Sequence, residues 1–250
     1  MNAWFSAGAP VTRDEPDFDP LIIWLTAALL GLGLVMVYSA SIAIAEAGAI
    51  AGGKPHYFLA RHALFLLLGV GAALLAVQVP MRAWQLGAPY LFVLGSALLV
   101  IVLIPGVGKE VNGSQRWLSF GGYNLQPSEL MKLFVVLYAA DYTVRKAAHM
   151  ASFRKGFLPM FGVMLITGAL LLQEPDFGAF AVISVIAMGV LFLGGMNWRL
   201  FASLVVLLVA GFVLLIWSSP YRMQRVLGFM DPWADPFGAG YQLSHALIAF

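Results

Sequence analysis

Uncharged apolar stretches long enough to cross a lipid bilayer recur along this chain of 250 residues. A helix of about 20 apolar residues crosses the hydrocarbon core. We expect membrane spans at Leu21–Ala45, Ala63–Val79, Ala83–Ile104, Phe157–Gln173, Phe177–Trp198 and Leu200–Tyr221. A weaker span runs from Pro127 to about Ala140, and an eighth opens at Gln242. We therefore expect the chain to be a fragment that ends within its eighth span.

The composition agrees with a membrane protein and excludes several other classes. Hydrophobic residues make up 61% of the chain and charged residues 10%, whereas a soluble domain carries about 25% charged residues. The apolar runs do not alternate with polar residues, which predicts an all-α, polytopic helical bundle rather than a barrel. No cysteine is present, and the net charge of +2 comes with no basic run suited to nucleic acid. Walker A, H-E-x-x-H and G-x-S-x-G motifs are also absent from the sequence.

The distribution of basic residues predicts the orientation of the spans. The segment RKAAHMASFRK, residues 145–155, is the densest basic loop and lies close to two span ends. Under the positive-inside rule this loop is cytoplasmic. Residues 1–20 then form a cytoplasmic tail, and residues 21–250 form one transmembrane domain. The polar loops 105–126, 173–176 and 219–241 then lie together on the outer face.

The first outer loop and the span after it carry several candidate site residues. Arg116 beside Trp117 suits a lipid phosphate or a sugar face, although an aromatic-belt residue with a snorkelling arginine explains the pair equally well. Asn112-Gly113 is a turn signal, and Gln126 lies near the cap of the following helix. Glu129 and Lys132 share a helix face, either as a functional pair or as a pair that only fixes helix packing.

Two further loops carry acidic residues whose role the sequence leaves open. In QEPDFGAF, Glu174 and Asp176 suit a proton relay, a cation site or a plain turn. The segment YRMQRVLGFM can form one or two interfacial amphipathic turns. In the DPWADPFGAG that follows it, a carboxylate held above the bundle can serve as a general base, or both aspartates can simply form turns. The four histidines are scattered, so a histidine-built metal site is not expected.

Three motifs together resemble those of the SEDS family, the shape, elongation, division and sporulation proteins. They are VNGSQRWLSFGGYNLQPSELMKL, QEPDFGAF and DPWADPFGAGYQLSHALIAF. Their order and spacing match over nearly the whole chain. MVYSAS and AADYTVRK, residues 36–41 and 139–146, resemble the division branch of the family more than the elongation branch.

The resemblance implies a ten-span bundle and a peptidoglycan glycosyltransferase that polymerises lipid II at the outer face of the cytoplasmic membrane. The essential acidic residue of the family corresponds to Asp235. We expect the other site residues to fall into two groups. Candidate substrate contacts are Arg61, Arg116, Trp117, Gln126, Tyr241 and Gln242, while Glu129, Lys132, Glu174 and Asp176 serve as structural or relay groups. No cofactor is expected, except for a divalent cation that would accompany the substrate pyrophosphate.

The resemblance also implies partners and leaves rival functions open. The expected partners are a class B penicillin-binding protein with transpeptidase activity and other divisome proteins, at the division septum. A lipid II flippase is the main rival, and a non-catalytic scaffold is a third possibility. Few charges lie within the predicted spans and the unusual residues gather on the outer face, which favours surface chemistry.

Overall fold

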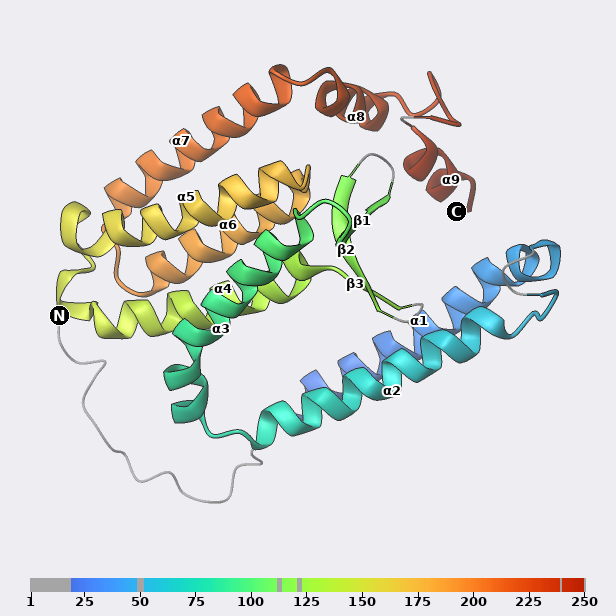
Figure 1. Ribbon diagram of the computed structural model, residues 1–250, viewed down its shortest axis with the longest axis horizontal. Coiled ribbons are helices and arrows are strands. Elements are labelled where there is room, and N and C mark those ends of the chain that lie inside the picture. The colour runs from blue at the N-terminus through green and yellow to red at the C-terminus, as the bar shows by residue number, and fades with distance from the viewer. Residues whose placement is uncertain (1–18, 49–51, 112–113, 121–122, 239, 250) are drawn as a thin grey trace. The chain divides into compact units, whose positions relative to one another are not determined.

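The computed structural model describes residues 19–48, 52–111, 114–120, 123–238 and 240–249 (Figure 1). It divides after Pro80 into two compact units, which are described separately. The predicted N-terminal tail lies almost entirely outside the described residues, as does the predicted turn at Asn112-Gly113.

The first unit is a pair of packed helices, α1 (Pro20–Ala47) and α2 (Tyr57–Gln78). Asp19 caps α1 by accepting a hydrogen bond from the Leu21 backbone N–H at 2.8 Å, and Pro20 occupies the first helical turn. At the other end of α1, the rings of Tyr38 and His56 stack at 5.6 Å. Both helices are apolar on nearly all sides, as expected for helices surrounded by lipid.

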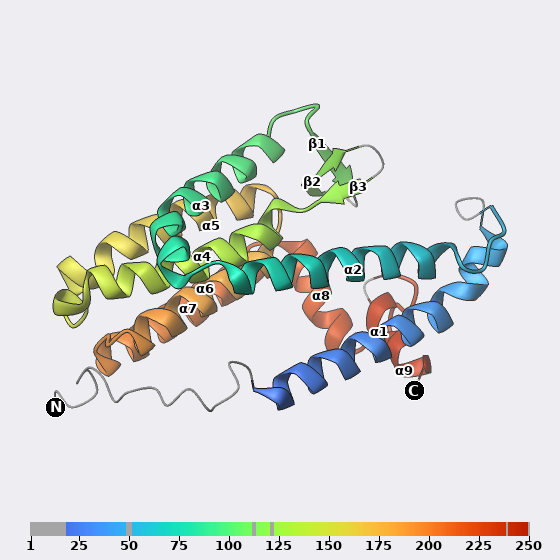
Figure 2. The same cartoon turned by 90° about the horizontal axis from the view of Figure 1, so that it is seen from below.

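The second unit holds seven α-helices in its described part, with a small sheet at one end (Figures 1 and 2). The helices are α3 (Met81–Val102), α4 (Pro127–Arg145), α5 (Leu158–Gln173), α6 (Phe177–Leu193), α7 (Trp198–Trp217), α8 (Pro220–Met230) and α9 (Tyr241–Ala249). A 3₁₀ turn (Ala147–His149) and a π-helix (Phe153–Phe157) connect α4 to α5.

Helix α4 forms the centre of this unit, and its principal neighbours are α3 and α6. Its side chains Met131 and Val135 are fully buried and pack with Leu99 of α3 and Ile183 of α6. The protein-covered surroundings of α4 explain why this helix can be less apolar than the others. It carries the ion pairs Glu129–Lys132 and Asp141–Arg145.

Five helices in the described part of the chain are long and apolar enough to cross a membrane. They cover Pro20–Glu46, Tyr57–Gln78, Met81–Val102, Phe153–Gln173 and Trp198–Trp217, and the shorter apolar helix α6 adds a sixth candidate. The prediction of a polytopic helical membrane bundle is therefore confirmed.

Three predicted span boundaries differ from the structure. The span expected to end at Trp198 ends at Leu193, because a turn follows in which Gly195 takes a φ of +97°. The span expected to reach Tyr221 ends at Trp217, since Pro220 begins the separate helix α8. The span expected to stop near Ala140 continues as α4 to Arg145.

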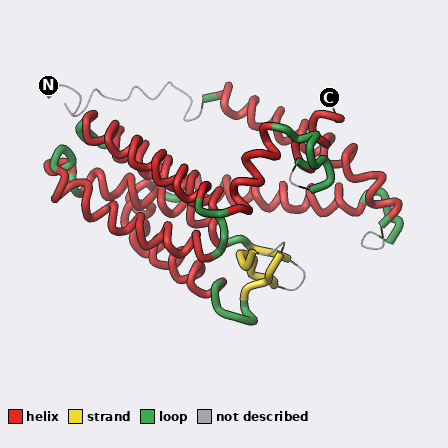
Figure 3. The backbone as a smooth tube through the Cα atoms, turned by 90° about the horizontal axis from the view of Figure 1, so that it is seen from above, coloured by secondary structure: helices red, strands yellow, loops and turns green. Residues whose placement is uncertain are grey.

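The loop predicted at residues 105–126 contains a three-stranded antiparallel sheet that the sequence analysis missed (Figure 3). Its strands are β1 (Gly108–Val111), β2 (Ser114–Phe120) and β3 (Tyr123–Leu125), in that order. The overlooked signal is the pair of two-residue turn sequences, Asn-Gly at 112–113 and Gly-Gly at 121–122, which divide this segment in the sequence pattern of two successive hairpins. The sheet fixes which residues of this segment face the helices.

Gly95 allows α3 and α4 to pack closely. A Cβ atom at this position would lie 2.7 Å from the sulfur of Met131 and 2.8 Å from the ring of Phe134, whereas a Cβ at Gly87 of the same helix would meet no atom within 4 Å. We expect Gly95→Leu to lower the free energy of unfolding by about 1–3 kcal/mol relative to Gly87→Leu. Thermal unfolding of the two variants in detergent measures this, and equal midpoints would contradict the packing.

Candidate functional site

The end of the second unit that carries the sheet also holds the α5–α6 turn and the start of α4. We call this region the sheet end. The Ser114 hydroxyl, at the start of β2, donates a hydrogen bond to the backbone carbonyl of Glu174 at 2.6 Å. Both residues are buried. This bond ties the sheet to the α5–α6 turn, although the two residues are far apart in sequence.

Asp176 accepts more side-chain hydrogen bonds than any other described residue of the sheet end. One carboxylate oxygen accepts hydrogen bonds from Gln126 Nε2 at 2.8 Å and from Ser128 Oγ at 2.9 Å. The other accepts from the Ala179 backbone N–H at 3.2 Å and so caps α6. Asp176 therefore joins the beginnings of α4 and α6.

Arg116 of β2 extends from the sheet towards this carboxylate. Its Nη1 lies 3.9 Å from Asp176 Oδ1, and part of its side chain stays exposed. Alternation along β2 puts Ser114 and Arg116 on one face of the strand, and both line the same cavity. Trp117 points from the opposite face and does not line that cavity.

Glu174 is the most deeply buried acidic group of the sheet end. Its exposed fraction is 0%, and within the described residues neither carboxyl oxygen has a hydrogen-bond partner. Burial raises the pKa of Glu174 to about 8, with a further increase from the negative charge of Asp176 and an opposing decrease from Arg116. Glu174 is therefore largely protonated at neutral pH.

Three arginines border a cavity of about 740 Å³ at the sheet end, which we call the arginine cavity. Arg116 comes from β2, while Arg222 and Arg225 come from α8. Asp176 is the one carboxylate among the described residues that line it. The lining thus carries a net positive charge, as suits an anionic ligand.

Arg222 also holds α8 against the bundle. Its Nη1 donates a hydrogen bond to the Leu215 carbonyl at 2.9 Å, near the C-terminus of α7. Its guanidinium carbon lies 5.5 Å from the centre of the Phe177 ring, at the start of α6. The segment YRMQRVLGFM, predicted to form one or two amphipathic turns, is observed within the longer helix α8, over eleven residues.

Asp235 borders a second cavity, of about 450 Å³, which we call the aspartate cavity. Tyr221 and Arg225 of α8 line both the aspartate cavity and the arginine cavity. The Arg225 guanidinium lies over the Tyr221 ring at 4.9 Å. A carboxylate and a cluster of cations therefore lie on either side of one shared wall.

The loop around Asp235 is held by its own backbone and by α9. The Asp235 carbonyl accepts hydrogen bonds from the backbone N–H groups of Gly238 at 3.3 Å and Gly240 at 3.0 Å. A Cβ atom on Gly238 would overlap the Asp235 carboxylate. The buried Ser244 hydroxyl donates to the Pro236 carbonyl at 3.0 Å. The position of the carboxylate thus depends on a glycine three residues further on.

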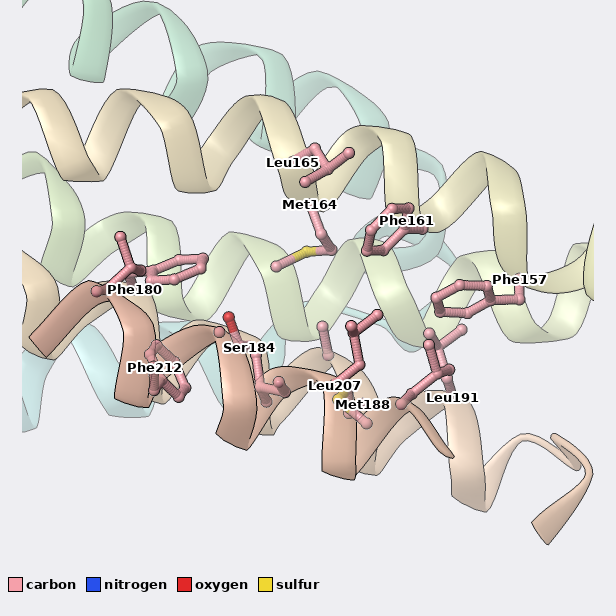
Figure 4. A pocket seen from close by; sticks show the side chains of 15 residues that line it. Phe157, Phe161, Met164, Leu165, Phe180, Ser184, Met188, Leu191, Leu207 and Phe212 are labelled. Carbon is pink, nitrogen blue, oxygen red and sulfur yellow. The ribbon is translucent and has the colours of Figure 1, made fainter. Parts of the chain in front are cut away.

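An apolar cavity of about 270 Å³ lies between α5, α6 and α7 (Figure 4). Phe180 and Phe212 line it, and the Phe212 ring also contacts Phe177 at 5.1 Å in an edge-on arrangement. Phe177 lines the arginine cavity. Aromatic rings therefore separate an apolar cavity from a cationic one.

The remaining predicted site residues lie in several places. Arg61 belongs to the first unit, where its guanidinium approaches the Tyr57 hydroxyl at 3.5 Å. Glu129 and Lys132 form an ion pair of 2.7 Å in the first turns of α4. Tyr241 lines the aspartate cavity, and its ring lies 4.0 Å from that of His245. The side chain of Gln242 is outside the described part of the chain.

Sequence reasoning missed four polar residues of this site: Ser114, Ser128, Arg222 and Arg225. The available signal for the arginines was their spacing of three on one helical segment, which places them on one face. The described residues include no group of three metal-ligating side chains, and the oxygens of Asp176 are taken up by protein donors. The described residues of the site therefore provide no built set of ligands for a divalent cation.

The raised pKa of Glu174 predicts a pH-dependent stability. Because the folded protein binds this proton more tightly than the unfolded chain does, the free energy of unfolding falls as the pH rises from about 4.5 to about 8. Glu174→Gln removes a slope of up to about 1.4 kcal/mol per pH unit. In thermal unfolding across this pH range, the midpoint of Glu174→Gln should rise relative to that of the wild type as the pH increases. The exposed Glu110→Gln on β1 is the control, and parallel curves for all three proteins would contradict the assignment.

Comparison with known proteins identifies related sequences. Residues 20–250 match the family model of the FtsW, RodA and SpoVE cell cycle proteins. The chain is 66% identical over 234 residues to a probable peptidoglycan glycosyltransferase FtsW of Aromatoleum aromaticum, a match that covers 94% of this chain and 57% of that protein. A protein of the same name from Burkholderia thailandensis is 52% identical over 246 residues, covering 97% and 53%. The chain thus spans little more than half the length of these relatives.

Two solved structures have a similar fold. The rod shape determining protein RodA of Thermus thermophilus aligns with a TM-score of 0.58 and 26% identity, over 79% of this chain and 60% of that one. A chain of a peptidoglycan synthase complex aligns with a TM-score of 0.60 and 30% identity, over 85% and 62%. These matches confirm the resemblance drawn from the three motifs. The chain belongs to the FtsW/RodA/SpoVE family of cell cycle proteins.

Proposed function

We propose that the protein is a peptidoglycan glycosyltransferase that polymerises lipid II, with Asp235 as its general base. The observation that carries this proposal is the wall of Tyr221 and Arg225 shared by the aspartate and arginine cavities. Glycosyl transfer from a lipid pyrophosphate needs a base at the attacking hydroxyl and positive charge at the leaving group. The two cavities supply these side by side, and the names of the related proteins support the same activity.

In the proposed reaction, Asp235 accepts the proton of the C4 hydroxyl of the acceptor sugar. The hydroxyl oxygen attacks the anomeric carbon of the donor strand and forms the new glycosidic bond with inversion. The bond from that carbon to the pyrophosphate oxygen breaks, and undecaprenyl pyrophosphate leaves with the bonding electrons. The proton then passes from Asp235 to solvent.

The arginine cavity suits the pyrophosphate of the donor. Arg116, Arg222 and Arg225 can offer several N–H donors to its oxygens, and guanidinium groups match phosphate geometry well. Arg222 and Arg225 thereby join Arg116 as candidates. Arg61 stays a candidate from the first unit, and Trp117 remains one for stacking on sugar.

The apolar cavity between α5, α6 and α7 suits the isoprenoid chain of the substrate. Its described lining is almost wholly aliphatic and aromatic, with Ser184 as the one polar side chain among the residues that form it (Figure 4). The contacting rings of Phe177 and Phe212 line the arginine cavity and the apolar cavity respectively, so the two cavities are neighbours. An amphiphile with an anionic head and an apolar chain would satisfy both cavities together.

A flippase would need polar groups along a path through the bilayer. In the described spans of the second unit, the acidic side chains lie in α4 and are ion-paired. The arginine cavity and the aspartate cavity lie instead at the sheet end. This arrangement favours chemistry on a substrate that is already at the membrane surface. A non-catalytic scaffold would not need the ordered loop that holds Asp235.

The proposal extends to the setting of the reaction. We infer one transmembrane domain over residues 21–250, with a cytoplasmic N-terminus and residues 219–241 as the large extracytoplasmic loop. The sheet end then faces outwards, at the division septum. A class B penicillin-binding protein would crosslink the strands, together with other divisome proteins. A solved relative from a complex that couples polymerisation with crosslinking supports this partnership.

Asp235→Asn tests the base directly. We expect this variant, in the full-length protein with its transpeptidase partner, to lose at least about 100-fold in the rate of glycan-strand formation from labelled lipid II. Asp231→Asn is the matched control, because Asp231 accepts the Trp233 backbone N–H through an oxygen that asparagine retains. Strand formation by both variants would remove Asp235 from the chemistry.

Gly238→Ala tests the placement of that carboxylate. The added methyl group would overlap the Asp235 side chain and displace it from the aspartate cavity. We expect about 10- to 100-fold slower polymerisation with normal folding. Gly189→Ala in α6, where a Cβ meets no atom within 4 Å, should leave the rate unchanged. Equal rates for both alanine variants would show that Gly238 does not position the carboxylate.

A further inference from the structure

The proposed reaction makes no use of Glu174, which is buried beside the arginine cavity. Three buried side-chain atoms in the described chain have no hydrogen-bond partner: Arg116 Nε and the two carboxyl oxygens of Glu174. Arg116 Nε is a donor and the two Glu174 oxygens are acceptors, and the positive charge of Arg116 lowers the pKa of Glu174. Buried polar groups in native structures normally find partners, so orphan groups on two residues of the sheet end, where β2 is tied to the α5–α6 turn, point to a role.

We propose that Glu174 is a positioning residue for Arg116 and that it acts as a protonated carboxyl. It supports the guanidinium from the buried side without neutralising the positive charge that Arg116 presents to the arginine cavity. This inference rests on the proposed function, because it takes the ligand of that cavity to be the pyrophosphate of a lipid-linked donor.

Burial of Glu174, together with the negative charge of Asp176, favours the protonated form over the opposing effect of Arg116. Arg116 from β2 and Asp176 from the same turn are the charged groups that interact with it, while Ser114 and Ser128 from the adjoining elements are neutral. Asp176 accepts bonds from Gln126, Ser128 and Ala179, which stabilise its carboxylate. Arg116 can balance one carboxylate but not two.

Ionisation of Glu174 would therefore change what the cavity presents to a ligand. With Glu174 protonated, the charges of Arg116 and Asp176 balance, and Arg222 and Arg225 leave the cavity positive. A carboxylate at Glu174 would give Arg116, Asp176 and Glu174 together a net negative charge. It would also draw the Arg116 guanidinium away from the cavity. Both effects weaken the binding of an anion.

Binding of undecaprenyl pyrophosphate to the full-length protein in detergent tests the inference. We expect the affinity of the wild type to fall about three- to tenfold relative to Glu174→Gln between about pH 6.5 and about pH 9. Any change in the protonation of the pyrophosphate affects both proteins equally, so it does not alter the ratio of their affinities. Glu110→Gln, on the exposed side of β1, should follow the wild type. Parallel profiles for the wild type and Glu174→Gln would overturn the inference.

A second set of variants separates positioning from a general structural role. Glu174→Ala, which leaves Arg116 without its buried neighbour, should weaken binding at both pH values, whereas Glu174→Gln should bind as the wild type does near neutral pH. In an Arg116→Ala background the effect of Glu174→Ala should disappear, since coupled residues are not additive. An undiminished effect in that background would show that Glu174 acts by another route.

Infrared spectroscopy measures the protonation state of the Glu174 carboxyl group and needs no added ligand. The wild type should show a protonated-carboxyl C=O band near neutral pH that is missing from Glu174→Gln. Absence of this band in the wild type would overturn the inference, even if lipid II polymerisation were intact. If the band were present but the wild type did not bind the pyrophosphate lipid, the proposed function would fail, and the ligand role of Glu174 with it.

Discussion

The sheet end depends on the hydrogen bonds that the Asp176 carboxylate accepts. This carboxylate accepts hydrogen bonds from Gln126 and Ser128 at the start of α4, and from the backbone N–H of Ala179 at the start of α6. The same carboxylate faces Arg116 from the sheet. Two helix starts and one strand are thus fixed by a single buried group. Removing it would leave several donors without an acceptor at a buried site, which is costly.

The placement of positive charge follows from this arrangement. The sheet carries Arg116 to one side of the arginine cavity, and Arg222 anchors α8 on the other side through Leu215 and Phe177. Helix α8 then forms the wall behind which Asp235 lies. The cations and the candidate base therefore come from segments far apart in sequence. The fold of the second unit brings them together.

The membrane helices could be predicted from the sequence because their signal is local. Runs of apolar residues locate α1 to α3, α5 and α7, and three loop motifs pointed to Asp235 and Asp176. The sheet was missed because its strands are short and their sequences do not alternate regularly between polar and apolar residues, although the paired residues are close in sequence. The cavity shared by Arg116, Arg222 and Arg225 was missed because β2 and α8 are far apart in sequence. Burial of Glu174 and its raised pKa also depend on tertiary packing, and no pattern in QEPDFGAF reveals them.

The most direct measurement is a structure of the full-length Asp235→Asn variant with lipid II bound, determined by electron cryo-microscopy. Our account predicts the donor pyrophosphate against Arg116, Arg222 and Arg225, its isoprenoid chain between α5, α6 and α7, and an acceptor hydroxyl next to residue 235. A pyrophosphate bound away from these arginines, or an acceptor sugar remote from residue 235, would contradict it.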